Sequence, residues 1–194
     1  MPIGVLRPKG SQGVCKVRVI SGTLRGLKLN TLSGTDTRPT LDRVKEALFS
    51  MLFDRVADSI GLDLFAGSGA LGIELLSRYG KECVFVDSSL AAVEVVKSNI
   101  SKARLEDKSL VITGDAVSFV KGTDKKFDII FLDPPYKSGL YEQILAIIKE
   151  RNLLNPDGVV VCECSPDCDF SLCGFVPIKD KTYGKVRLLV LEEE

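Results

Sequence analysis

Short apolar runs alternate with segments of helical periodicity from residue 60 onward, and this alternation restricts the fold more than any other feature. The apolar runs are 60–66, 82–87, 109–113, 126–133 and 159–164. The segments of helical periodicity between them are 70–80, 89–100, 116–120 and 140–150. Such alternation is typical of a parallel sheet with helices on both faces and right-handed crossovers. We therefore expect an α/β fold, completed by two strands around Tyr183 and Gly184.

The residues before this alternation predict a small hairpin followed by a helix. Residues 17–30 predict two short strands around a turn at Gly22–Gly26. In residues 37–56, Pro39 suits a first helical turn, and apolar side chains recur at helical spacing at Leu41, Val44, Leu48, Leu52 and Val56. The opposite, polar face of this helix is expected to carry Arg43, Lys45 and Glu46. Further on, "NPDG" at 155–158 predicts a turn before the fifth strand.

The composition is typical of a soluble globular protein with one buried core. Of 194 residues, 45% are apolar and 27% charged. No apolar run approaches the roughly 20 residues that span a bilayer, and the first residues lack the continuous apolar stretch of a secretory signal. Six cysteines occur without regular spacing, so we expect reduced thiols and a cytoplasmic protein that does not enter the membrane.

The charges balance over the whole chain, with 26 basic and 26 acidic residues, but they are unevenly distributed. Residues 1–35 include no acidic side chain, and their basic residues are Arg7, Lys9, Lys16, Arg18, Arg25 and Lys28. A basic segment on a mildly acidic body indicates either a polyanionic partner at this end or a solvated extension. We divide the chain into a basic N-terminal arm with its hairpin, residues 1–37, and a single domain, residues 38–194.

The chain contains no histidine, so the commonest general base is excluded, together with Ser-His and Cys-His nucleophiles and most metal sites. Four cysteines near the C-terminus follow the pattern C-x-C-x₃-C-x₄-C: Cys162, Cys164, Cys168 and Cys173. Structural zinc sites usually pair C-x₂₋₄-C knuckles, and cysteine in an apolar strand behaves as a small hydrophobe. We therefore expect no metal.

A glycine-rich loop follows the first strand, with the spacing Gly67-x-Gly69-x-x-Gly72. The first two glycines allow a tight turn that approaches a ligand closely, and the third allows the helix to pack on the strand. Asp87 ends the second strand, where a carboxylate can accept from both hydroxyls of a ribose. An NAD-dependent dehydrogenase has the same features, so the loop alone leaves the ligand open.

Asp63 lies near the carboxyl end of the first strand, four residues before Gly67. A carboxylate there is poorly placed against a pyrophosphate because two anions repel. It suits a ligand with an ammonium and a sulfonium group, namely S-adenosylmethionine. The alternative is an aspartate that makes only local hydrogen bonds at the end of its strand.

The motif "DPPY", residues 133–136, directly follows the fourth apolar strand. Two prolines end the ladder and stiffen a short loop at the sheet edge. Asp133 and the Pro134 carbonyl can accept the two hydrogens of an exocyclic amine, and Tyr136 can stack on the base that bears it. Accepting these hydrogens directs the nitrogen lone pair at a methyl carbon. A proline-rich turn with a surface tyrosine is the alternative interpretation.

"DLFAGSGALGIE" together with "DPPY" resembles the class I S-adenosylmethionine-dependent methyltransferases that act on exocyclic nitrogen. With "VISGTLRGLKL", "RPTLDRVKEALFSML" and a C-terminal "YG", the chain is similar to the RsmD family of bacterial 16S ribosomal RNA (guanine-N2)-methyltransferases, from about Val17 to Val190. The resemblance implies a Rossmann-like, mostly parallel sheet of seven strands with a reversed last strand. It also implies S-adenosylmethionine as cofactor and 16S rRNA as partner, within an assembling 30S particle and with the enzyme as a monomer.

The resemblance also implies roles for individual residues. The cofactor-binding residues would be Asp63, Phe65, Gly67, Gly69, Asp87, Asp115 and Ala116. The residues around a flipped-out guanine would be Asp133, Pro134 and Tyr136. The RNA-binding residues would be Arg18, Arg25, Lys28, Arg38, Arg43 and Tyr183. Two departures from the family pattern are Asp87, where relatives often have glutamate, and the stretch 179–187, which has fewer arginines than is usual.

Some of these residues also admit a purely structural interpretation, and three other functions compete. Phe65 is an apolar residue at a strand end that equally suits the core, and Tyr183 either contacts RNA or holds its turn.

The nearest alternative function is methylation of adenine N6 in DNA or RNA, because "DPPY" serves both amines. An NAD-dependent oxidoreductase shares the glycine spacing but lacks visible hydride-transfer residues. A non-catalytic RNA-binding protein is disfavoured by the intact Asp63, Asp87 and Asp133.

Overall fold

A sheet of seven strands, ordered β3-β2-β1-β4-β5-β7-β6, forms the centre of the computed structural model, which describes residues 17–32, 39–135 and 139–194. The strands are β1 (Ile60–Asp63), β2 (Glu82–Asp87), β3 (Ser109–Thr113), β4 (Phe127–Leu132), β5 (Leu154–Cys164), β6 (Phe175–Tyr183) and β7 (Val186–Glu193). The α-helices are α1 (Pro39–Met51), α2 (Ala70–Ser77), α3 (Leu90–Ala103), α4 (Ala116–Gly122) and α5 (Leu140–Glu150). Two short 3₁₀ helices span Phe53–Arg55 and Glu106–Lys108.

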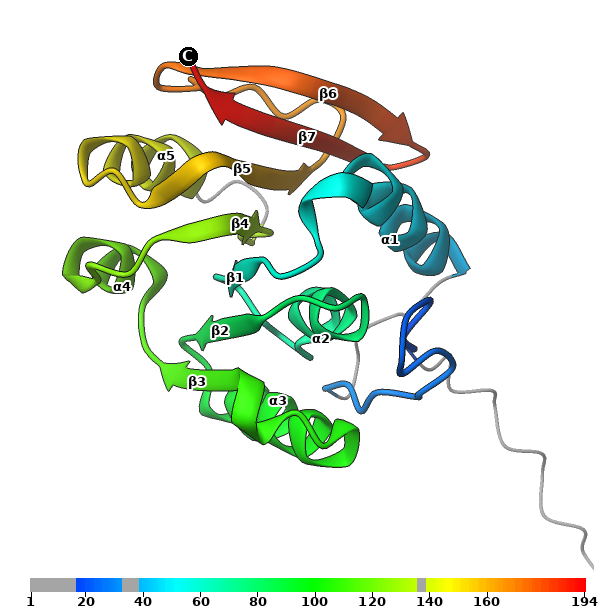
Figure 1. Ribbon diagram of the computed structural model, residues 1–194. Helices are drawn as coiled ribbons and strands as arrows, with labels where there is room; N and C mark the ends of the chain where they lie inside the picture. Colours follow the sequence, from blue (N-terminus) through cyan, green and yellow to red (C-terminus); the bar gives the residue numbers. More distant parts are fainter. Residues whose placement is uncertain (1–16, 33–38, 136–138) are drawn as a thin grey trace, which may run out of the picture.

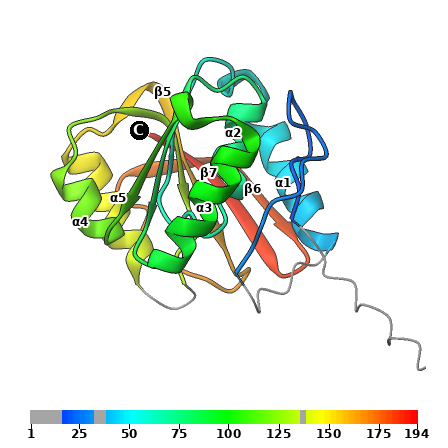
Figure 2. The same cartoon turned by 90° about the horizontal axis from the view of Figure 1, so that it is seen from below.

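The strand directions confirm the predicted fold. Strands β1 to β5 pair in parallel, whereas β7 runs antiparallel to both β5 and β6. The helices lie on both faces of this sheet, with α1, α2 and α3 on one face and α4 and α5 on the other (Figures 1 and 2). The short apolar strands suit this arrangement because a parallel sheet covered on both faces must be apolar on both faces.

Each face of the sheet carries its own hydrophobic cluster. Phe85 of β2 faces the cluster beneath α1, α2 and α3, whereas its neighbours Val84 and Val86 face the cluster beneath α4 and α5. This alternation follows from the period of two along a strand. In the described part of the chain, no helix combines the length and the apolar character needed to cross a bilayer.

The predicted N-terminal hairpin is present in a minimal form. Arg18 and Lys28 form a single antiparallel bridge, and the Val19 amide donates to the Leu27 carbonyl at 2.9 Å. Val19 and Leu29 are buried in the cluster that α1, α2 and α3 cover, so the hairpin packs as part of the domain's core (Figure 1). The boundary that we predict at residue 37 lies outside the described residues.

Two helices end earlier than predicted, α1 at Met51 and α2 at Ser77. Three further local predictions need correction. The first strand ends at Asp63, three residues earlier than predicted, because the chain turns there into the glycine loop. The stretch "NPDG" lies inside β5 as an irregularity, since Leu154 pairs with Phe127 and Val159 with Ile129, and Asp157 adopts a φ of 62°.

The third correction concerns Lys45, which lies on the buried side of α1 and is only 6% exposed. Its Nζ lies 3.1 Å from Glu74 Oε2 and donates to the Arg18 carbonyl at 2.5 Å. The hairpin covers this flank of α1, so a position that is polar by helical periodicity becomes interior. Burial lowers the pKa of Lys45, and the attraction of Glu74 opposes that shift.

Candidate active site

The carboxyl ends of β1, β2, β4 and β5 bring four acidic residues to one edge of the sheet. Asp63 pairs in register with Phe85 of β2 and Phe131 of β4. Asp133 directly follows β4, and Glu163 is the penultimate residue of β5. The sequence-based expectation that Asp63, Asp87 and Asp133 meet along one edge is therefore met, and Glu163 joins them.

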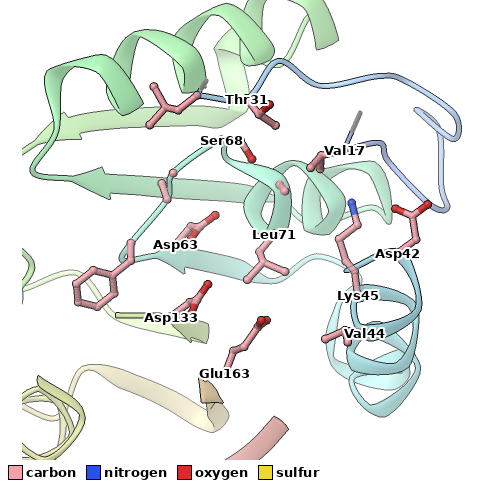
Figure 3. A pocket seen from close by; sticks show the side chains of 15 residues that line it. Val17, Thr31, Asp42, Val44, Lys45, Asp63, Ser68, Leu71, Asp133 and Glu163 are labelled. Carbon is pink, nitrogen blue, oxygen red and sulfur yellow. The ribbon is translucent and has the colours of Figure 1, made fainter. Parts of the chain in front are cut away.

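Two neighbouring pockets open at this edge. The first, of about 280 Å³, lies between the strand ends, the glycine loop, α1 and the N-terminal segment. Figure 3 shows Asp63, Asp133 and Glu163 pointing into it from neighbouring strands, with Asp42, Val44 and Lys45 of α1 opposite.

The second pocket, of about 530 Å³, extends toward the ends of β2 and β3. Its lining includes Asp87, Ser88, Gly114, Asp115, Ala116, Pro134 and Leu140. Both pockets share Phe65, Asp133 and Glu163, so together they form one continuous cleft across the sheet edge. Open α/β sheets bind their ligands in this position, beyond the carboxyl ends of the strands.

The glycine loop has the backbone conformation that its sequence predicts. Gly67 and Gly69 have φ values of 55° and 75°, in the left-handed region that glycine adopts without penalty. A Cβ on Gly72 would lie 2.3 Å from the Phe85 ring, so only glycine lets α2 pack this closely on β2. A Cβ on Gly67 would meet only the carbonyl of Phe65, at 3.9 Å, so this side of the loop is open to the pocket.

Asp87 holds the loop in place from the end of β2. Its Oδ2 accepts from the Gly67 amide at 2.8 Å, and its Oδ1 accepts from the Ser89 amide at 2.9 Å. A carboxylate offers about four acceptor positions. Each oxygen therefore has capacity left for a ligand hydroxyl in the second pocket.

Asp63 is a buried carboxyl, 3% exposed, that accepts one hydrogen bond, from the Gly72 amide at 3.1 Å. Burial raises its pKa to about 7, the Gly72 hydrogen bond opposes the shift, and the charges of Asp133 and Asp87 add to it. The local hydrogen bond foreseen in the structural interpretation is present. A cation in the first pocket would further stabilise the ionised form.

Asp133 and Glu163 form a pair of neighbouring carboxyls. Leu132 pairs with Cys162, so the next residue on each strand, Asp133 and Glu163, lies at the same level. Asp133 is open to the pocket, but the surrounding protein partly desolvates it and raises its pKa to about 6. Burial and the neighbouring Asp133 charge raise the pKa of Glu163 to about 8.

Phe65, Asp115, Ala116 and Pro134, from the predicted cofactor and target residues, also line this cleft. Asp115 caps α4, its Oδ1 accepting from the Ser118 amide at 2.8 Å, and this hydrogen bond lowers its pKa. Ala116 is buried, Phe65 is half-buried, and Pro134 is buried at the wall of the second pocket. Tyr136 lies outside the described residues.

The predicted RNA-binding residues that the structure describes lie on the hairpin, on α1 and at the end of β6. Arg18, Arg25, Lys28 and Arg43 are all exposed, and Arg18 pairs with Asp42 at 2.9 Å. Tyr183, at the end of β6, packs half-buried against the core, as its structural interpretation requires. Arg38 lies outside the described residues.

Glu163 is the site residue that the sequence analysis missed. The available signal was an acidic residue inside the apolar run "VVVCEC", at the end of a strand that neighbours β4.

The described cysteines, Cys83, Cys162, Cys164, Cys168 and Cys173, are free thiols. Within ranges 17–32, 39–135 and 139–194, no group of three His, Cys, Asp or Glu side chains is arranged to hold a metal ion.

The fold and the cleft define a class, the Rossmann-like α/β proteins to which solved methyltransferases belong. A candidate methyltransferase of Escherichia coli, yhhF, superposes with a TM-score of 0.83 at 30% identity, covering 92% of this chain and 98% of that one. The chain belongs to the family described as conserved hypothetical protein 95, whose model matches residues 17–192.

Two relatives carry names that describe an activity. A candidate rRNA methyltransferase of Bacillus subtilis, YlbH, is 40% identical over 173 residues, which is 87% of this chain and 94% of the relative. The ribosomal RNA small subunit methyltransferase D of Haemophilus influenzae is 37% identical over 175 residues, which is 88% of this chain and 91% of the relative.

Proposed function

We propose that this protein is an S-adenosylmethionine-dependent methyltransferase that methylates the exocyclic N2 of a guanine in 16S rRNA. The observation that carries the proposal is the continuous cleft in which Asp63 and Asp133 face one cavity from adjacent strands. Family membership and the names of the relatives support the same activity and an rRNA substrate.

The residues of the cleft fit this cofactor. Asp63 is a buried carboxyl that an ammonium group would complement, and the loop at Gly67 leaves open space beside it. Asp87 would accept from the ribose hydroxyls, while Asp115 and Ala116 would frame the adenine in the second pocket. When bound, S-adenosylmethionine supplies an electrophilic methyl group on a sulfonium. Asp63 also disfavours binding of a dinucleotide, because the carboxylate would repel the pyrophosphate.

Asp133 and the Pro134 carbonyl would orient the target amine. Both accept its hydrogens, which draws the nitrogen toward a tetrahedral geometry and frees its lone pair for bond formation. Asp133 has a pKa of about 6, so it is largely ionised at neutral pH and can accept. It takes up the proton that the amine gives up as the amine gains the methyl group. Positioning and electrostatic stabilisation supply most of the rate, with Tyr136 stacking on the base.

The RNA would approach across the hairpin and α1, which form one wall of the cleft. The exposed Arg18, Arg25, Lys28 and Arg43 suit phosphate contacts, which position a nucleic acid without reading its sequence. The resemblance adds Arg38 and Tyr183 to the expected RNA contacts, and the target base would be flipped into the cleft. We place the monomeric enzyme in the cytoplasm, on an assembling 30S particle.

The test uses small ribosomal subunits from cells that lack this protein. Purified protein and tritium-labelled S-adenosylmethionine are added, and the rRNA is digested to nucleosides and separated. We expect label in N2-methylguanosine, and none with Asp133→Ala. Label in N6-methyladenosine would show that the target is adenine N6 and not guanine N2. Absence of transfer to any RNA would overturn the proposal.

A further inference from the structure

Glu163 has no part in the mechanism above, although it lines both pockets. Along β5, Val161 faces the cluster beneath α1, whereas Cys162 and Cys164 face the opposite cluster. The alternation of the strand therefore directs Glu163 to the face of the sheet that carries Asp63 and Asp133, where Figure 3 shows it.

The position of Glu163 is fixed by its surroundings. The Tyr141 hydroxyl donates to the Glu163 carbonyl at 2.5 Å, and the Tyr141 ring stacks on Phe170 with centroids 4.5 Å apart. The flanking Cys162 and Cys164 are buried. A side chain held by a rigid strand end is well suited to recognise part of a ligand, because little conformational freedom is lost on binding.

Glu163 and Asp133 stand at one level on neighbouring strands, which lie about 4.8 Å apart in a sheet. Two acceptors with this spacing can reach adjacent groups on one edge of a planar base. Asp133 is assigned to the exocyclic amine, and the cofactor side of the cleft is toward β1. Glu163 therefore faces the ring atom beside the amine, on the side away from the glycine loop.

The ring atom beside the amine differs between the two candidate bases. In guanine, the N2 amine lies between N1–H, which donates a hydrogen bond, and N3, which accepts one. In adenine, the N6 amine is flanked by N1, which carries a lone pair and accepts. A carboxylate beside the amine would thus pair with a guanine whose N1–H is turned toward it and repel adenine. A site built to bond a donor discriminates strongly against an analogue that lacks it.

We propose that Glu163 selects guanine by accepting a hydrogen bond from the ring N1–H beside the target amine. This inference rests on the proposed function and adds to it the residue that determines the base. The selection belongs to the ionised carboxylate, which a hydrogen bond from N1–H would stabilise, because a protonated carboxyl could also donate to adenine N1. Asp133 is the neighbouring charge that acts on the Glu163 carboxyl.

The first test compares Glu163→Leu and Glu163→Gln on small subunits from cells lacking the protein. Glu163→Leu removes the acceptor, and we expect kcat/KM for guanine to fall about 30- to 100-fold, as for loss of a buried hydrogen-bond partner. Glu163→Gln keeps an acceptor oxygen and should stay within about 5-fold of the wild type. Glu150→Gln, on the exposed end of α5, is the matched control and should match the wild type.

The second test changes the base, so that a merely structural role of Glu163 can be recognised. Small subunits are reconstituted with 2-aminopurine at the target position, which keeps the 2-amine but lacks N1–H. We expect about 100-fold slower transfer by the wild type and little further loss by Glu163→Leu. Because 2-aminopurine also lacks O6, 6-thioguanine, which keeps N1–H, serves as the control and should be methylated at a near-normal rate.

The outcomes separate the inference from the proposed function. If the wild type methylates no guanine, the proposed function fails and this inference with it. If the wild type is active and Glu163→Leu retains its kcat/KM, the inference alone is wrong. It is also wrong if Glu163→Leu is impaired but still discriminates against 2-aminopurine as strongly as the wild type does.

Discussion

Glu74 is the residue whose replacement tests most directly how the N-terminal hairpin is attached to the domain. Its side chain is fully buried in α2. Its two oxygens accept from the Ile20 and Ser21 amides at 2.8 and 2.9 Å, and they pair with Lys45 at 3.1 Å and Arg78 at 2.8 Å. One carboxylate thus joins the hairpin, α1 and α2 beside the first pocket.

Glu74→Leu keeps the volume of the side chain but leaves the buried Lys45 without its ion-pair partner and two partly buried amides without acceptors. Breaking a buried ion pair costs about 3–5 kcal/mol, and each unpaired amide adds about 1–3 kcal/mol before relaxation. We therefore expect the free energy of unfolding to fall by about 4 kcal/mol or more. For a chain of this length, that corresponds to a decrease in Tm of about 8–16 °C.

The assay is urea unfolding followed by circular dichroism, combined with hydrogen exchange of the hairpin amides. Lys45→Met should cost less than Glu74→Leu, because Glu74 keeps Arg78 and both amides as partners. Glu94→Leu removes the exposed pair with Lys97 and serves as the control, with little effect expected. A Glu74→Leu protein within about 1 kcal/mol of the wild type, or unchanged protection of the Ile20 amide, would refute the reasoning.

Four further predictions concern the cleft and the glycine loop beside it. Burial raises the pKa of Asp63 to about 7, and a bound ammonium should lower it, so the wild type should release about half a proton when it binds S-adenosylhomocysteine at pH 7. The Asp63→Asn variant should release no proton. Calorimetry in buffers of different ionisation enthalpy measures this release, and a binding enthalpy that is independent of the buffer would contradict the prediction. In the ligand-free protein, the raised pKa of Asp63 contributes to the free energy of unfolding below pH 4, and we expect this contribution to be lost as the pH rises through 7. Urea unfolding at several pH values should show this loss in the wild type and not in Asp63→Asn, and the same pH dependence in both proteins would contradict it. Gly72→Ala places a Cβ 2.3 Å from the Phe85 ring and should destabilise by about 1–3 kcal/mol, whereas Gly122→Ala, which meets nothing within 4 Å, should not; equal Tm values would show that the packing tolerates both. Asp133→Ala should abolish methyl transfer and change the affinity for S-adenosylhomocysteine less than about 3-fold, and near-normal turnover would remove Asp133 from the mechanism.

The fold was predictable because its local signals agree with one another. Pro39 begins α1, and α5 begins at Leu140 and ends at Glu150 as predicted. The prediction was wrong where distant segments decide the outcome. At Lys45, helical periodicity indicates an exposed face, but the hairpin covers that face and Glu74 supplies the counter-charge.

The sequence alone determined which acidic residues of β1, β2 and β4 share an edge. Parallel strands end on the same side, so Asp63, Asp87 and Asp133 had to lie along one border of the sheet. Their residue types, together with the glycine loop, were sufficient to indicate the chemistry.

Only the tertiary structure decided that Glu163 belongs to the site. The pairing of β5 with β4, and the register that sets Glu163 level with Asp133, depend on contacts between residues far apart in the chain. The raised pKa values of Asp63 and Glu163 have the same origin, because desolvation depends on which segments of the folded chain cover a group. Local periodicity carries no information on that covering.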